Sequence, residues 1–204
     1  MSAVLSNIYM LDADERLSRY VSAIGGFYRR YSDDILLVVP PGYISEAAEQ
    51  LNSVLGDLSL TNHQDKMVHS EFRETNSRII ASTPLVYLGF EFDGEAVRLR
   101  QRSIARFHQR MTRAIRSSYR AAKVRGDVKL NRRKLNDRHS HLGRRNFISY
   151  AIRASEVFYP GEGRKTPIRR QIRRHALLLN SRIAKAECQL ARLTNHQWLE
   201  NAKN

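Results

Sequence analysis

The chain has 204 residues, which allows one or two domains, and its 35 Lys and Arg outnumber 20 Asp and Glu to give a net charge of +15. The single cysteine, Cys188, excludes a disulfide framework and a cysteine zinc site, and a packed helix position is expected for it. The longest apolar run, residues 35–39, is too short for a membrane span, and no secretory signal opens the chain. A cytoplasmic protein with no membrane partner is therefore expected.

The first predicted element is a helix over residues 4–20. It begins inside the segment SAVLSNIY, which spans residues 2–9. Its apolar residues recur at helical spacing: Val4, Leu5, Ile8, Leu11, Leu17 and Tyr20. An ordinary amphipathic helix is one interpretation of this stretch. Asp12, Asp14 and Glu15 would then lie on the helix surface, where acidic residues near a helix start favour solubility and complement the helix dipole.

Residues 27–40, FYRRYSDDILLVVP, predict a β-hairpin with two carboxylates at its tip. Aromatic residues precede a Ser-Asp-Asp cluster that favours a turn, and a run of branched apolar residues follows it. Asp33 and Asp34 repel each other and lose hydration on burial, so a packed core would not hold both without compensation. A solvated turn is the common explanation for such a pair. The alternative is a site for Mg²⁺, which binds through one or two carboxylates together with substrate phosphates.

A second helix is predicted over residues 44–55, with Gly56 ending it. Four apolar residues share one of its faces: Ala47, Leu51, Val54 and Leu55. The segment LSLTNHQDK follows at residues 58–66. Lys66, at the end of this segment, would by itself be a solvated charge.

Residues 86–92, VYLGFEF, predict a strand that enters a hairpin turn at Asp93 and Gly94. A plain hairpin with a packed aromatic face is one interpretation. Gly89 also marks a position where a foreign backbone can approach closely, because glycine has no side chain.

In this order, the four segments resemble the motifs of bacterial reverse transcriptases. Residues 31–34, YSDD, match the Tyr-x-Asp-Asp signature, and residues 2–9 resemble the family's Ser-Pro-x-Leu-Ser-Asn-x-Tyr segment. Residues 58–66 resemble Leu-x-x-Asn-x-x-Lys, and residues 87–90 resemble the Tyr-Leu-Gly-Phe primer grip. Ala3 stands where many members have proline. In this departure the chain resembles the abortive-infection branch of the family, which serves antiviral defence.

The resemblance implies roles for individual residues. Asp33 and Asp34 would be catalytic and would bind Mg²⁺ in a two-metal site. Lys66 would approach the triphosphate and could protonate the leaving pyrophosphate. Contacts with the nucleotide or the primer would come from five residues: Ser2, Asn7, Tyr31, Leu88 and Gly89.

The family carries another catalytic aspartate upstream of these motifs, with the fingers and the first half of the palm. No acidic residue precedes Asp12, and the helix-surface acids are poor substitutes, because a two-metal site needs carboxylates that converge from separate elements. The sheet would also lose a neighbouring strand. The chain is therefore expected to be inactive alone: a truncated product, an internal-start product or half of a split enzyme, completed by a separate chain.

The charge changes sign near Arg98. Residues 1–97 carry a net charge of −7, residues 98–175 carry +20 and residues 176–204 carry +2. Self-repulsion of such a basic segment would destabilise the fold without a polyanion, so nucleic acid held through its phosphates is the expected partner. A membrane surface is less favoured, because no stretch joins this charge to a broad face of Trp and Phe.

Three helices are predicted in the basic part. In the first, Arg106, Arg110 and Arg113 recur on one face as candidate nucleic-acid contacts, and another face is apolar: Phe107, Met111 and Ile115. The second would run over about residues 142–157 and the third over about residues 166–183. Thr166 would cap the third helix with Pro167 in its first turn, and residues 161–163 would form the loop before it.

The expected fold class is α+β. Residues 1–97 would be the C-terminal part of a reverse transcriptase palm, an antiparallel sheet with helices, and residues 98–204 a basic, all-helical, thumb-like domain. The completed enzyme would extend a DNA primer on an RNA template with dNTPs and Mg²⁺. The alternative is a non-enzymatic nucleic-acid-binding module that retains a polymerase relic.

Overall fold

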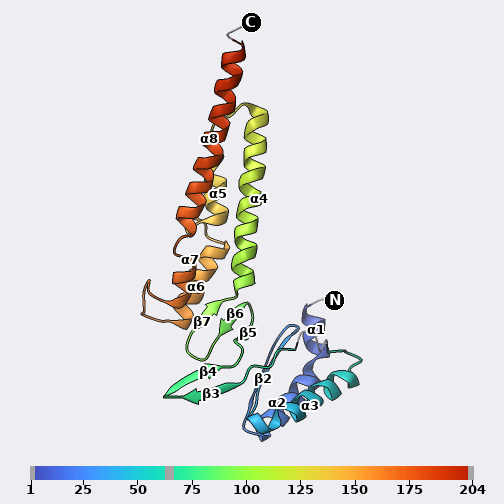
Figure 1. Ribbon diagram of the computed structural model, residues 1–204. Coiled ribbons are helices and arrows are strands. Elements are labelled where there is room, and N and C mark those ends of the chain that lie inside the picture. Colours follow the sequence, from blue (N-terminus) through green and yellow to red (C-terminus); the bar gives the residue numbers. More distant parts are fainter. Residues whose placement is uncertain (1–2, 63–66, 202–204) are drawn as a thin grey trace. The chain divides into compact units, whose positions relative to one another are not determined.

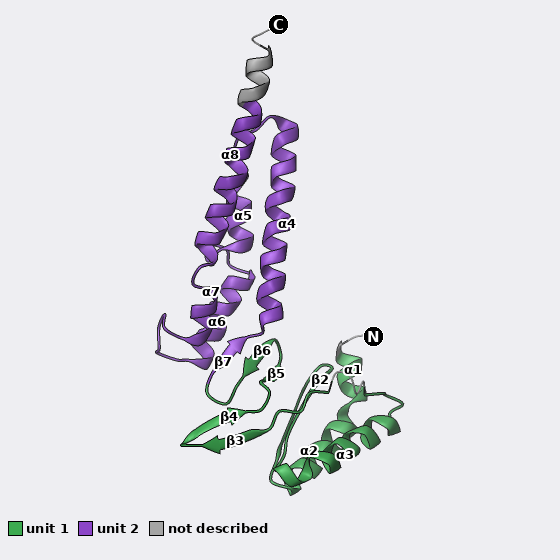
Figure 2. Cartoon of the chain, in the orientation of Figure 1, with its two compact units in different colours: residues 1–95 green, residues 96–204 purple. Residues whose placement is uncertain are grey.

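The computed structural model describes residues 3–62 and 67–201, and the side chains of residues 4–62 and 67–194. Helices and small antiparallel sheets alternate along these ranges, so the expected α+β class is confirmed (Figure 1). The chain divides into two compact units, residues 1–95 and residues 96–204, which Figure 2 colours separately.

Unit 1 begins with two helices, α1 (Ala3–Tyr9) and α2 (Leu11–Ala23), where the sequence predicted one. The break falls at Met10, whose N–H bonds to the carbonyl of Asn7 three residues earlier, as in a tightened turn. The prediction of a buried apolar face is also wrong for the first part of this stretch. Four of its residues are more than half exposed: Val4, Leu5, Ile8 and Leu11.

Helix α3 (Ile44–Asp57) follows a single 3₁₀ turn (Pro41–Tyr43). The prediction for its apolar face is confirmed, since all four expected residues are buried: Ala47, Leu51, Val54 and Leu55. Gly56 does not end the helix. It lies inside the last turn, and the N–H of Leu58 caps the helix by bonding to the carbonyl of Leu55 at 3.1 Å.

Three hairpins complete unit 1. Strand β1 (Phe27–Tyr31) pairs with β2 (Asp34–Val38), β3 (Phe72–Thr75) with β4 (Arg78–Ala81), and β5 (Leu85–Tyr87) with β6 (Phe90–Phe92), all antiparallel. The sequence did not predict the middle hairpin. Its turn consists of Asn76 and Ser77, both with positive φ, a conformation that asparagine tolerates better than most residues.

The continuous strand expected over residues 86–92 is wrong. The chain reverses at Leu88 and Gly89, with φ of 50° and 84°, so the hairpin turn falls inside the predicted strand. Asp93 and Gly94 instead lie against β4. The carbonyl of Asp93 accepts a hydrogen bond from the N–H of Ala81 at 2.9 Å.

The core of unit 1 lies between α2, α3 and one face of the first hairpin. Its buried residues come from the two helices and the residue before α2: Met10, Ala13, Leu17, Leu51, Val54 and Leu55. The hairpin packs Tyr28, Ile35 and Leu37 against this cluster. This packing determines which face of the hairpin remains open.

Unit 2 contains the short strand β7 (Val97–Leu99) and helices α4 (Gln101–Arg125), α5 (Arg132–His139), α6 (Phe147–Phe158), α7 (Pro167–Ile172) and α8 (His175–Asn201). Helices α4 and α8 lie side by side (Figure 1). They share one core with α5, which includes Met111, Ile115, Leu135, Leu179, Ile183 and Leu190. No helix among the described residues combines the length and apolarity that crossing a membrane requires.

Several helix boundaries in unit 2 differ from the predictions. The second predicted helix is α6, which begins only after Asn146, whose side chain accepts the N–H of Ser149 in a capping box. The third divides into α7 and α8, although Thr166 caps α7 and Pro167 opens it as predicted. Cys188 is exposed on α8, so its expected packed position is wrong. Helix α5 was not predicted.

Candidate functional site

Strands β1 and β2 place the Tyr-Ser-Asp-Asp segment at an open hairpin tip, as the sequence predicted. Ser32 and Asp33 form the two-residue turn, and Ser32 has a φ of 58°. Tyr31 is paired directly with Asp34. Because directly opposed residues of an antiparallel pair share a face, their side chains lie on the same face of the hairpin. Both residues are exposed.

The opposite face of the hairpin is fastened to helix α2 by Asp14. One carboxylate oxygen of Asp14 accepts hydrogen bonds from the hydroxyl of Tyr28 at 2.5 Å and from Nε of Arg30 at 2.6 Å. The other oxygen accepts from Nη2 of Arg30 at 2.5 Å. The expectation that Asp14 serves only solubility and the helix dipole is therefore wrong, because its carboxylate is a structural partner of β1.

Arg30 extends this link to the turn itself. Its Nη1 donates to the carbonyl oxygen of Ser32 at 2.8 Å and, at 3.3 Å, to the side-chain oxygen of Asn7 on α1. One guanidinium thus joins α1, α2 and the turn that carries Asp33. The sequence placed Asn7 near the site but did not identify Arg30. Successive residues of a strand face opposite sides, so an outward Tyr31 implies an inward Arg30, and this alternation was the available signal.

Partial burial and hydrogen bonding shift the pKa values of the side chains in this cluster. The Arg30 side chain is 8% exposed and that of Asp14 27%. Burial alone would raise the pKa of Asp14, but the hydrogen bonds from Arg30 and Tyr28 outweigh it and hold the pKa below its usual value. Burial and the same carboxylate strongly raise the pKa of Tyr28. The carboxylate and the guanidinium therefore stay ionised as a pair at neutral pH.

Asp33 and Asp34 have a different environment from Asp14. Both are exposed, and neither forms an ion pair or a side-chain hydrogen bond with another residue of the described ranges. Their four oxygens are acceptors that a hard cation can use. Among the side chains of residues 4–62 and 67–194, however, no group of three or more His, Cys, Asp or Glu could hold a metal ion. The two carboxylates thus fit part of a Mg²⁺ ligand set and do not complete it.

The turn of Leu88 and Gly89 follows a tyrosine that interacts with the hairpin. The hydroxyl of Tyr87 is buried and has no hydrogen-bond partner among the described residues. Its pKa is raised by burial and by the carboxylate of Asp34, with Arg29 opposing the shift. Arg29 and Asp34 both lie on the outer face of the hairpin, so Tyr87 approaches the face that Tyr31 and Asp34 share.

The turn at Gly89 is open. A Cβ atom built on Gly89 would have no heavy atom within 4 Å, apart from its chain neighbours, and Leu88 is exposed. A second backbone can therefore approach this turn without a clash. Two further residues implied by the resemblance, Ser2 and Lys66, lie outside the described residues.

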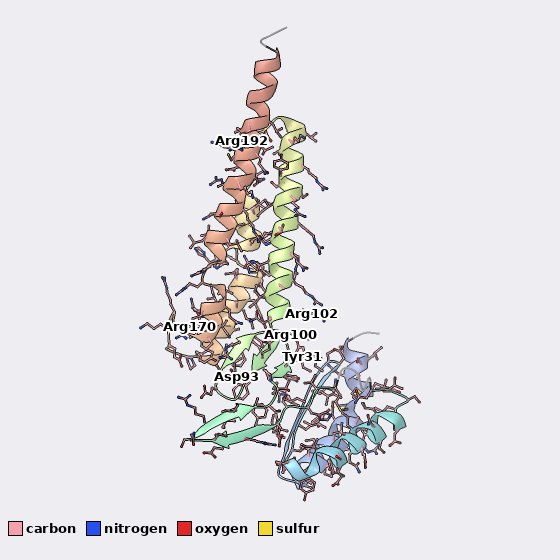
Figure 3. The ribbon with its side chains drawn as sticks, viewed as in Figure 1. Tyr31, Asp93, Arg100, Arg102, Arg170 and Arg192 are labelled. Carbon is pink, nitrogen blue, oxygen red and sulfur yellow. The ribbon has the colours of Figure 1, made fainter. Side chains whose placement is uncertain are left out.

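The candidate nucleic-acid contacts lie on α4. Arg106, Arg110 and Arg113 are exposed, as the helical spacing predicted, and the apolar residues of the other face are buried: Phe107, Met111 and Ile115. None of the three arginines has an ion pair with an acid in the described part of the chain. Basic side chains continue along unit 2 from Arg102 at the start of α4 to Arg192 on α8 (Figure 3).

No protein-family model matches this sequence, and comparison with curated proteins finds no relative.

Proposed function

We propose that this chain is part of an RNA-directed DNA polymerase similar to bacterial reverse transcriptases. Unit 1 would act as the portion of the palm that carries the catalytic hairpin, and unit 2 as a basic, thumb-like domain. The observation that carries the proposal is the open Tyr31–Asp34 tip. Its carboxylates form no ion pair or side-chain hydrogen bond in the described ranges, and Arg30 bonds to the turn behind them.

The residues of the tip have distinct roles in this proposal. Asp33 and Asp34 would hold Mg²⁺, which when bound neutralises charge on the reacting phosphates. Arg30 keeps the turn in one position relative to α2, because it bonds to Asp14 and to the carbonyl of Ser32. A fixed turn lowers the cost of bringing both carboxylates to one ligand. Tyr31 shares the outer face with Asp34 and would contact the nucleotide or primer there.

The other contacts with the nucleotide and the nucleic acid would come from segments outside the hairpin tip. The open turn of Leu88 and Gly89 would place its backbone against the primer end. Asn7 would hold its position through Arg30, while Ser2 and Lys66 would contact the nucleotide and the triphosphate. The exposed arginines of α4 would bind phosphates of the RNA template and the DNA primer.

Catalysis requires at least one more carboxylate than the tip supplies. Because the side chains of residues 4–62 and 67–194 include no cluster of three metal-ligating groups, the additional ligand would come from outside these ranges. A separate chain that carries the fingers and the first half of the palm is one source. Without that ligand, the tip could bind a cation weakly but would not align an attacking and a leaving oxygen.

A non-enzymatic nucleic-acid-binding module is the second candidate function. The net charge of +20 over residues 98–175 favours it independently of the hairpin, as does the incomplete ligand set of the described residues. In this case, the tip would be a relic, and the arginines would provide the whole function.

Primer extension separates the two candidates. The protein is expressed from its native locus with the flanking reading frames, and incorporation of dNTPs on an RNA template is measured with Mg²⁺. We expect incorporation by the product of the whole locus, none above background by the purified 204-residue chain, and loss of activity in Asp33→Ala. Asp57→Ala, which removes an exposed carboxylate paired with Arg16, is the matched control. Nucleic-acid binding without incorporation in any preparation would favour the second candidate, and full activity of Asp33→Ala would refute the first.

A further inference from the structure

A pocket between α4 and α8 lies apart from the apolar core of unit 2. Its volume is about 300 Å³, and it is lined by His108, Gln109, Thr112, Arg113, Arg116 and Arg182. The first five belong to α4, and four of them are spaced so that they form one stripe along the helix: Gln109, Thr112, Arg113 and Arg116. Arg182 reaches the pocket from α8.

Hydrogen bonds hold Arg182 in place across the two helices. Its Nη1 donates to the hydroxyl of Thr112 at 2.7 Å, and that hydroxyl donates to the carbonyl of His108 at 2.9 Å. No other hydrogen bond or ion pair engages the Arg182 guanidinium within the described residues, so its remaining N–H groups are available. A fixed guanidinium loses little entropy when it binds a second acceptor.

The pocket carries positive charge that no acid neutralises. Its lining includes three arginines and no carboxylate. Arg113 and Arg116 are exposed and, like Arg182, form no ion pair with any acid that the structure describes. By contrast, unit 2 pairs other arginines with acids, as in Arg132 with Glu187 and Arg169 with Glu156. Because three guanidinium groups line the same pocket, an anion bound there would be attracted by all three.

We propose that this pocket binds a single phosphate group, which Arg113, Arg116 and Arg182 would grip and Thr112 would orient through its bond to Arg182. The guanidinium fork presents parallel N–H groups that match two oxygens of one phosphate. This goes beyond the proposed polymerase function, since it assigns a discrete site that includes α8 rather than a diffuse stripe on α4, and it does not require catalytic activity.

His108 offers an independent probe of the site. Burial lowers its pKa, and the nearby charges of Arg182 and His175 lower it further. A phosphate bound among the arginines would offset the positive charge and raise that pKa toward its usual value. The imidazole resonances of His108 therefore report occupancy without any assay of activity.

The test is a titration of the full chain with inorganic phosphate at constant ionic strength, followed by NMR. We expect shifts confined to residues 108–116 and the region of Arg182, together with a raised pKa of His108. Arg116→Gln and Arg182→Gln should each weaken phosphate binding about tenfold, as loss of a hydrogen bond to a charged group commonly does. Lys123→Gln removes the same charge from the same helix outside the pocket and should leave the affinity unchanged.

Arg116→Gln keeps the test decisive if Arg182→Gln does not fold, because Arg116 makes no described hydrogen bond or ion pair. Equal weakening by Lys123→Gln, or no shift at millimolar phosphate, would overturn the proposal. The source of the phosphate is resolved by two oligonucleotides of one sequence, with and without a 5′-phosphate. Tighter binding of the phosphorylated form to the parent chain, lost in Arg116→Gln, assigns the pocket to a terminal phosphate. Equal binding of both, weakened alike in Arg116→Gln, assigns it to the phosphodiester backbone.

Discussion

The guanidinium of Arg30 donates hydrogen bonds to both carboxylate oxygens of Asp14, at 2.6 and 2.5 Å, and so joins strand β1 to helix α2. The same guanidinium bonds to the carbonyl of Ser32, which immediately precedes Asp33. A half-buried charge pair in one part of unit 1 therefore holds the turn that carries an exposed carboxylate in another.

Asp14→Asn should destabilise unit 1 by about 2 kcal/mol, because the half-buried guanidinium of Arg30 would lose charge-assisted hydrogen bonds. Urea denaturation measures this loss, and hydrogen exchange of residues 27–38 should accelerate in the same variant. Asp12→Asn, an exposed change on the same helix, is the control and should shift stability by less than about 0.5 kcal/mol. If both variants unfold alike, the link between Asp14 and Arg30 does not hold the hairpin.

Gly94→Ala should destabilise the chain more than Gly25→Ala. Both glycines have positive φ, so each substitution introduces backbone strain of about 1 kcal/mol. At Gly94 the added Cβ would also lie 2.1 Å from the carbonyl oxygen of Ile79, whereas at Gly25 it would meet nothing within 4 Å. Thermal unfolding of the two variants gives the comparison. Equal melting temperatures would show that β4 can move away from Gly94.

Binding of labelled duplex should weaken linearly in log affinity as log salt rises, because each neutralised phosphate releases counterions. A footprint of roughly five phosphates gives a slope of about −4, from the ~0.9 per contact typical of B-DNA. Replacing Arg106, Arg110 and Arg113 together with Gln should flatten the slope by about two to three and weaken all sequences alike.

The control for this titration is the triple variant Arg16→Gln, Arg19→Gln and Arg73→Gln, which removes the same charge from unit 1 at exposed ion pairs. Its slope should match that of the parent chain. A parent chain without salt dependence would mean that the charge of α4 faces only solvent.

Stability should fall as the pH drops below about 6.5, the usual value for histidine. Burial lowers the pKa of His108, His139 and His175 in the folded chain, so between the folded and unfolded pKa values the unfolded state binds more protons. The stability is fully present above pH 6.5, declines as the pH falls through this window, and levels off below the folded pKa values. Each unit of pKa difference corresponds to about 1.4 kcal/mol.

His139→Phe isolates one contribution to this pH dependence. His139 is buried against the ring of Phe107, with a centroid separation of 5.8 Å, and both of its ring nitrogens lack partners among the described residues. The variant should lose less stability between pH 7 and pH 5 than the parent chain in urea denaturation. A change at a buried residue that does not titrate, Met111→Leu, is the control and should leave the pH dependence unchanged.

Local sequence patterns predicted the elements whose signals are local. The hairpin around residues 31–34 follows from strand formers on both sides of a turn cluster, and the buried face of α3 follows from helical spacing alone. Thr166 and Pro167 identify the start of α7 for the same reason. The catalytic roles of Asp33, Asp34 and Lys66 remain predictions.

Features that depend on tertiary contacts were not predictable in this way. Asp14 has the sequence context of a surface helix acid, and only the approach of Arg30 from β1 makes it a half-buried partner of the hairpin. Gly94 follows an aspartate and thus has the signature of a hairpin turn, yet its lack of a side chain serves the close passage of β4. Arg182 lies about seventy residues from the stripe that it completes on α4, so no local spacing indicates their pocket.

The buried hydroxyls of Ser155 and Thr166 form a hydrogen bond of 2.6 Å, which joins the two sides of an exposed loop in unit 2. Between them, Gly161 and Gly163 have positive φ and open space around their Cα atoms. Because α6 and α7 contact each other directly, through this hydrogen bond and the ion pair of Arg169 with Glu156, we expect that residues inserted between the two glycines would leave both helices in place. A fluorescent reporter or an affinity tag inserted at Glu162 would therefore label the protein internally and leave both termini free.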